Sequence, residues 1–308
     1  MITKKLFLAA AFIFLFLAGC TKKENEKSSS KFSLIDDLNV TVSFDEHPKR
    51  IITLAPSLTE MIYQINYDKY LIGNTLYCNY PEDARKKKKV GDMLTIDFEK
   101  IISLKPDLIL ISVEGNNKSA YDKLIELGLK VFVSNPRNYE GIKNTYLQIG
   151  KIIGSEKEAK LQVTEWEKSV NYIVTNSDST KSKTVMFLIS LNPLMLAGKN
   201  TFINEYIDLC GFKNIADDIK MSYPVLSREE VLKRNPDYIV YANSGAMAID
   251  KIAAAYPEWK NLKAVKNKNI VLVGADQYLR PGPRFIPALE DFFKKTRGSL
   301  PADSLLRR

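Results

Sequence analysis

The side chains that most often carry out chemistry are few in this sequence and lie far apart. Its 308 residues include one histidine, His47, and three cysteines. One imidazole is too few for a histidine-rich metal site, and no G-x-S-x-G, H-E-x-x-H or phosphate-binding glycine motif is present. Glu60 and Asp276 are the acids best suited to catalysis, and neither has an evident partner in the sequence. We therefore expect a binding protein without catalytic residues or a metal, rather than an enzyme or a structural surface protein.

The charge of the chain gives no indication of a nucleic-acid partner. Lysine and arginine number 45 against 36 aspartates and glutamates, which is a formal net charge of +9. The basic residues are interspersed with acidic ones, and even the densest run, residues 86–89, follows two acids. No basic stripe with interleaved aromatic residues is present. An apolar content of 45% instead predicts folded lobes that each bury a core.

Cys20 stands in the pattern of a lipid-attachment site. Two lysines precede an apolar run over residues 6–19, which is shorter than the roughly 20 residues that a membrane-spanning helix needs. Residues 17–20 read Leu-Ala-Gly-Cys, a lipobox, at which signal peptidase cuts before a lipid-modified cysteine. We expect residues 1–19 to be a signal peptide and acylated Cys20 to anchor the chain to a bacterial membrane, on the periplasmic side or at the cell surface. The alternative is an ordinary signal peptide with an incidental cysteine.

Residues 20–47 are expected to form the lipidated cysteine and a flexible tether. Residues 21–31 (TKKENEKSSSK) are polar and charged, so they have nothing to bury. Outside the cytoplasm, Cys78 and Cys210 could form a disulfide, although two isolated thiols are the favoured interpretation.

The rest of the chain alternates short apolar strands with helices. In the first half, strands are expected at 50–55, 71–73, 108–113 and 131–133, and helices at 58–65, 96–104 and 119–127. Residues 155–175 then place apolar residues every three or four positions, which predicts one helix about 30 Å long. The alternation resumes at 184–189, 202–209, 231–232, 238–241 and 270–273, with a last helix at 284–295. This pattern predicts an α/β fold with parallel sheets. The expected parts are lobes at 48–153 and 178–297, a connecting helix at 154–177 and a tail at 298–308.

An internal repeat supports two equivalent lobes. Residues 98–110 align without gaps on residues 228–240. In each copy a glutamate opens a helix, which ends before Pro-Asp and is followed by an apolar strand. The alternative is that helix, Pro-Asp and strand recur by chance. A cleft between two equivalent lobes is a usual place for a small ligand.

With these features the sequence resembles the bacterial solute-binding lipoproteins of ABC importers for cobalamin, haem and ferric siderophores, and among them the cobalamin binders most. The resemblance covers residues 50–295 and is carried by the segments 50–60, 80–81, 99–110, 192–193, 198–199, 227–232 and 276–284. It implies two Rossmann-like lobes joined by one long rigid helix, with the ligand cleft between them. It also implies a small macrocyclic ligand as cargo, no resident cofactor, and a partner made of an ABC permease dimer with ATPase subunits.

The resemblance assigns residues to the cleft. Tyr77 stands where the cobalamin binders have a cleft tyrosine, and Tyr223 where they have a cleft aromatic residue. Asp276 and Arg280 match a polar pair that meets the corrin amides. Aromatic faces for the macrocycle and a few polar groups at its rim are the combination that a large rigid ligand needs.

Three cleft positions depart from the cobalamin binders. Met93, Ser112 and Met195 stand where those proteins have aromatic residues. Methionine can still pack on a flat macrocycle, whereas serine cannot replace the area of a ring. Haem is the second candidate ligand, because Tyr77 could bind its iron while His47 is expected outside the cleft. An anionic ferric siderophore usually draws several guanidinium groups and ranks third.

Glu99 and Glu229 occupy matching positions in the repeat. In the family that the chain resembles, one surface glutamate on each lobe docks onto arginines of the two permease subunits, which implies this role for these two residues. The alternative is that both are only favourable first-turn residues of their helices.

Overall fold

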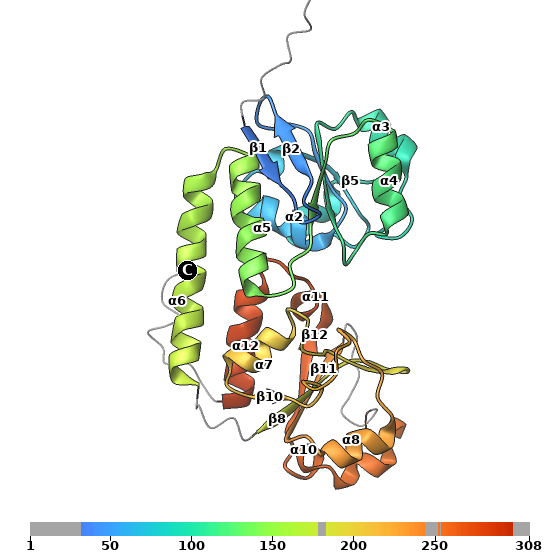
Figure 1. Ribbon diagram of the computed structural model, residues 1–308, viewed down its shortest axis with the longest axis vertical. Coiled ribbons are helices and arrows are strands. Elements are labelled where there is room, and N and C mark those ends of the chain that lie inside the picture. The colour runs from blue at the N-terminus through green and yellow to red at the C-terminus, as the bar shows by residue number, and fades with distance from the viewer. Residues whose placement is uncertain (1–31, 178–182, 244–251, 253, 298–308) are drawn as a thin grey trace, which may run out of the picture.

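The computed structural model describes residues 32–177, 183–243, 252 and 254–297. Figure 1 shows two α/β lobes stacked along the long axis of the molecule and connected at one side by α6 (Glu156–Asn176). The predicted fold class is confirmed, with a parallel sheet in each lobe and one long helix between them. Within the described ranges, no helix is both long and apolar enough to cross a membrane.

The sheet of the first lobe is parallel throughout. Its strand order is β5 (Lys88–Lys89), β4 (Leu71–Asn74), β3 (Ile51–Thr53), β6 (Leu108–Ser112) and β7 (Val131–Ser134). The helices of this lobe are α2 (Pro56–Gln64), η1 (Asp68–Tyr70), η2 (Glu82–Lys86), α3 (Phe98–Leu104), α4 (Lys118–Glu126) and α5 (Tyr139–Ile152). The strands β3, β6 and β7 are buried along their whole length, which explains their mostly apolar sequences.

The second lobe repeats this plan with one antiparallel addition. Its parallel strands are, in order, β10 (Lys213–Asn214), β8 (Thr184–Leu191), β11 (Tyr238–Asn243) and β12 (Ile270–Gly274), and β9 (Leu194–Leu196) pairs antiparallel with β8. Its helices are α7 (Asn204–Leu209), α8 (Arg228–Arg234), η3 (Pro257–Asn261), α10 (Lys263–Lys266), α11 (Ala275–Tyr278) and α12 (Phe285–Arg297).

The internal repeat has the same structure in both lobes. Lys105 and Asn235 end α3 and α8 in the left-handed conformation, with φ of 48° and 44°. The aspartate of each Pro-Asp pair, Asp107 or Asp237, then accepts hydrogen bonds from backbone N–H groups at the start of β3 or β8. Each repeat therefore connects a helix, the strand after it and the neighbouring strand in a similar way in the two lobes.

One hydrophobic cluster runs through both lobes. On the first lobe, Tyr139 of α5 stacks on Phe285 of α12, with ring centroids 5.5 Å apart. Phe285 in turn stacks on Tyr206 of α7 at 4.7 Å. Trp166 of α6 is buried against Tyr146, with ring centroids 4.6 Å apart. The lobes thus share a core on the side of α5, α6 and α12.

Helix α5 is not among the elements predicted from the sequence. The buried side of this helix packs into the shared core. Asn138 caps its first turn by accepting a hydrogen bond from the Gly141 N–H group. Where α5 packs against α6, Gly150 lies so close that an added Cβ would stand 2.5 Å from the Cβ atom of Ala159. The glycine therefore permits the close approach of the two helices.

The expected tether over residues 20–47 is wrong from residue 32 onwards. β1 (Phe32–Ile35) and β2 (Thr41–Phe44) form an antiparallel hairpin, in which Phe32 stacks on the buried ring of Phe44. The Asp36 carboxylate in the turn accepts hydrogen bonds from within the hairpin and from the Val133 N–H group of β7. His47 follows, and its Nδ1 lies 2.9 Å from the Ile152 carbonyl oxygen. These contacts attach the segment to the first lobe.

Candidate ligand-binding site

A cavity of about 540 Å³ lies between the lobes. It opens where the parallel strands end. Residues 55–57 follow β3, Ser112 ends β6 with Glu114 and Gly115 after it, and residues 275–276 follow β12. Loops at the carboxyl ends of parallel strands are the usual ligand sites of open α/β sheets. Five of the predicted cleft residues line the cavity, namely Tyr77, Met93, Tyr223, Asp276 and Arg280.

The sixth predicted residue, Met195, does not line the cavity. It lies in β9, where the chain pairs with β8 and forms a bridge to Val225. Ser112, which replaces an aromatic residue of the cobalamin binders, does line it but is buried at the end of β6. The apolar lining on the second lobe is contributed by Tyr223, Ala275, Leu279 and Pro281.

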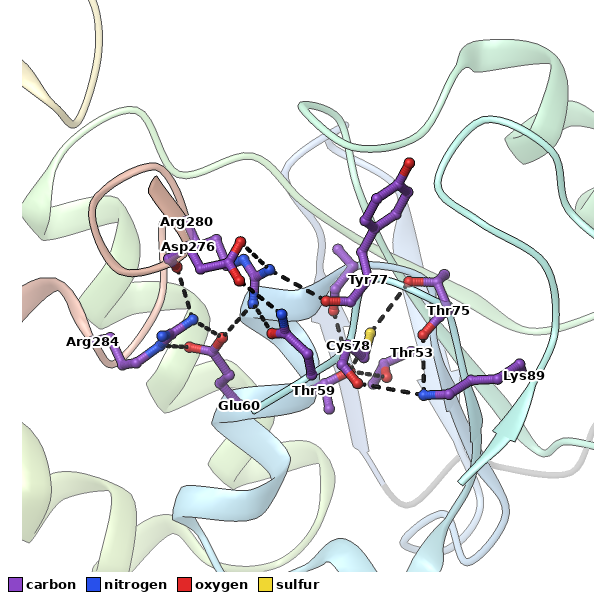
Figure 2. Close-up of polar contacts among 12 residues, drawn as sticks. Thr53, Thr59, Glu60, Thr75, Tyr77, Cys78, Lys89, Asp276, Arg280 and Arg284 are labelled. Atoms are coloured by element: carbon purple, nitrogen blue, oxygen red, sulfur yellow. Dashed lines mark hydrogen bonds and ion pairs between the residues drawn. The ribbon is translucent and has the colours of Figure 1, made fainter. Parts of the chain in front are cut away.

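Tyr77 projects from a loop that is held by hydrogen bonds to the residues beside it, as Figure 2 shows. Its side chain is 56% exposed, whereas the next residue, Cys78, is buried and its sulfur receives a hydrogen bond from the Thr59 hydroxyl. The Lys89 ammonium donates to the carbonyl oxygens of Thr75 and Cys78, and burial lowers its pKa. Cys78 and Cys210 are both buried free thiols, as favoured from the sequence.

A cluster of charged residues joins the two lobes next to the cavity (Figure 2). Glu60 of α2 has a side chain only 1% exposed, and its carboxylate accepts two hydrogen bonds from Arg284, at 2.8 and 2.6 Å. Arg280 lies 3.3 Å from the same carboxylate and 2.7 Å from Asp276. Asn79 donates to Asp276 and accepts from Arg280. Glu60 and Asp276, which have no evident partners in the sequence, are therefore both paired.

A second ion pair in the cavity was not predicted from the sequence. Glu114 follows β6, Arg137 follows β7, and both line the cavity with Nη1 and Oε1 3.2 Å apart. Burial raises the pKa of Glu114, against the effect of Arg137. Burial also raises the pKa of the Tyr223 phenol, and the Glu114 charge adds to this effect. Polar residues directly after predicted strands were the available signal for this pair.

The other candidate groups lie outside the cavity. His47 is held against Ile152 and does not line it. Among the residues with described positions, no group of three or more histidines, cysteines or acids could hold a metal ion. Glu99 and Glu229 are exposed in the first turns of α3 and α8, which lie at the outer ends of the two lobes (Figure 1). A backbone N–H group and the Ser227 hydroxyl lower the pKa of Glu229.

Comparison with known proteins agrees with this architecture. Residues 51–277 match the family described as periplasmic binding protein. The chain is 30% identical, over 90% of its length and 91% of the relative's, to the uncharacterized ABC transporter substrate-binding lipoprotein YvrC of Bacillus subtilis. It is 27% identical, over 83% and 91%, to the vitamin B12-binding protein of Pectobacterium carotovorum. A possible iron-binding, periplasmic solute-binding protein of Staphylococcus epidermidis superposes with a TM-score of 0.72 at 30% identity, covering 82% of this chain and all of that one.

Proposed function

Since the chain belongs to the periplasmic binding proteins of ABC transporters, we propose that it captures cobalamin or a related corrinoid outside the cytoplasm and delivers it to a permease with ATPase subunits. The observation that carries this ligand is the lining of the cavity between the lobes, where Tyr77, Met93 and Tyr223 offer apolar faces beside the polar pair Asp276–Arg280. The protein binds its cargo without changing it chemically. The similarity to the vitamin B12-binding protein of Pectobacterium carotovorum supports the same choice.

A corrinoid suits this lining for a physical reason. Its rigid ring gains from broad contact with aromatic and thioether side chains, and its peripheral amides need a few donors and acceptors at the rim. Cobalamin also brings its own axial base, so the protein need not supply a metal ligand. The side chains of the cavity meet these needs without a histidine.

The direct test is calorimetric titration of the purified protein with cyanocobalamin, cobinamide and haemin. We expect saturable binding of cyanocobalamin with a stoichiometry of one, and co-elution of its visible spectrum with the protein in gel filtration. Binding of haemin with no binding of either corrinoid would contradict the proposal.

Haem is the second candidate, and the exposed phenol of Tyr77 in the cavity is the observation that favours it. A tyrosinate is an established axial ligand of haem iron. If haem is the cargo, Tyr77→Phe would lose the spectrum of a tyrosinate complex. If a corrinoid is the cargo, the same variant would bind cyanocobalamin nearly as the wild type does, because the ring face remains.

Removing either cavity tyrosine is expected to weaken corrinoid binding at least tenfold. Burying an aromatic side chain contributes about 1.5 to 3 kcal/mol, and 1.4 kcal/mol corresponds to a factor of ten. Tyr77→Ala and Tyr223→Ala are therefore compared by calorimetry with Tyr121→Ala, since Tyr121 lies on α4 outside the cavity. Wild-type affinity in both cavity variants would show that the ligand binds elsewhere.

We also propose that acylation of Cys20 anchors the protein to a membrane. Cys20 and the preceding signal sequence lie outside the described residues, so this rests on the lipobox at residues 17–20. Metabolic labelling with radioactive palmitate should mark the wild type and leave Cys20→Ser unlabelled. Label retained in the variant would refute acylation at this position.

Glu99 and Glu229 are proposed to dock the protein onto the permease. Both carboxylates are exposed, and the repeat gives them the same place at the start of a helix on each lobe. Two such charges at the outer ends of the molecule suit a partner with two equivalent subunits.

A further inference from the structure

The pair Glu114–Arg137 stands at the carboxyl end of neighbouring strands. β6 and β7 are adjacent and parallel, so the residues that follow them, Glu114 and Arg137, come together at one edge of the cavity. The Glu114 side chain is 18% exposed and that of Arg137 47% exposed. Their contact, 3.2 Å between Nη1 and Oε1, is the one hydrogen bond that either side chain makes to the described part of the chain. Both retain polar atoms for a ligand.

The other arginine of the cavity is used differently. Arg280 contacts Glu60, Asp276, the Asn79 amide oxygen and the Tyr77 carbonyl oxygen. Its guanidinium is therefore largely occupied in joining the lobes. The pair Glu114–Arg137 does not connect the lobes in this way. It lines the cavity from the first lobe, and the pair Asp276–Arg280 lines it from the second.

A carboxylate beside a guanidinium is complementary to a primary amide. The carboxylate accepts from the amide N–H, and the guanidinium donates to its carbonyl oxygen. A ligand carboxylate could use only the guanidinium, and it would be repelled by Glu114. The low exposure of Glu114 strengthens that repulsion, because the charges are poorly screened by water.

We propose that Glu114 and Arg137 form an amide-recognition subsite, which selects a neutral carboxamide over a carboxylate on the rim of the ligand. This inference rests on the proposed function, because it assigns the pair to a side-chain amide of a corrinoid. Tyr223 of the second lobe lines the same cavity, and the charges of Glu114 and Arg137 affect the pKa of its phenol.

The test compares cyanocobalamin with its monocarboxylic acids, in which one peripheral amide is hydrolysed. The wild type is expected to bind cyanocobalamin at least tenfold more tightly than one of these acids. Glu114→Gln should reduce that ratio about tenfold, since the repulsion is removed and Arg137 remains. Arg137→Gln should weaken the binding of cyanocobalamin and increase the ratio of its affinity to that of the acid, since a lone carboxylate then faces the ligand. Glu82→Gln, in an exposed pair with Arg85 outside the cavity, is the matched control.

The outcomes separate this inference from the proposed function. Binding of cyanocobalamin by the wild type, with the same ratio in Glu114→Gln, Arg137→Gln and Glu82→Gln, would overturn the amide subsite and leave the corrinoid proposal intact. No binding of cyanocobalamin by the wild type would overturn both. Circular dichroism of each variant establishes that it is folded before its affinity is measured.

Discussion

Glu60→Ala is expected to lower the free energy of unfolding by about 3–5 kcal/mol, the usual cost of removing one partner from a buried ion pair. The Glu60 carboxylate is almost wholly buried and contacts both Arg280 and Arg284. Their side chains are only 11% and 17% exposed, so the substitution leaves two poorly solvated cations without their shared anion. Urea denaturation of the wild type and the variant measures the difference.

Two further variants make this result specific. Glu165→Ala removes an exposed carboxylate from its pair with Lys168 on α6 and should change stability by less than about 1 kcal/mol. Glu60→Gln keeps the shape and some of the hydrogen bonds, so it should fall between the wild type and Glu60→Ala. A loss below 1 kcal/mol in Glu60→Ala would mean that this cluster contributes little to holding the lobes together.

Reversing both docking charges, in Glu99→Lys/Glu229→Lys, is expected to weaken permease binding by about 100-fold or more. Close charge pairs at interfaces have coupling energies of about 1.5 kcal/mol upwards, and two pairs are lost at once. Affinity for the ligand should remain that of the wild type, because neither residue lines the cavity. The measurements are uptake by intact cells and binding to the permease in nanodiscs at several salt concentrations.

A second double variant distinguishes docking from helix stabilisation. Glu156 and Glu158 also lie exposed in the first turn of a helix, but this helix is α6, which begins just after α5 beside the first lobe. Glu156→Lys/Glu158→Lys therefore perturbs a helix terminus in the same way and should leave uptake unchanged. Equal uptake in the two double variants would exclude a docking role for Glu99 and Glu229.

Most of the fold could be predicted because its signals are local. β6 and β8 are buried strands with apolar sequences, and α6 shows its periodicity over 21 residues. The element α5 was missed because Gly141 and Gly150 interrupt its pattern, although close packing and capping explain both glycines. The hairpin was missed because its strands are only four residues long, too short for an alternation of apolar and polar residues to stand out.

The site could be predicted only in part, because its partners are distant in the sequence. The resemblance to a family predicted that Tyr77 and Asp276 lie in the cleft, and both line the cavity. It could not indicate that Arg284 binds Glu60, 224 positions away. The absence of Met195 from the cavity lining has a similar cause, since its place depends on how β9 pairs with β8. These contacts depend on strand register and on how the lobes pack, and no short stretch of the sequence predicts either of them.

The aromatic stack of Tyr139, Phe285 and Tyr206 has a consequence for the rate of uptake. Because one buried cluster continues through both lobes, a wide hinge motion would have to expose it to water. We therefore expect the empty and the loaded protein to present nearly the same surface to a permease. Empty copies would then compete with loaded ones, and flux would follow the fraction of copies that carry cargo. Overproduction of the protein at scarce ligand should slow import.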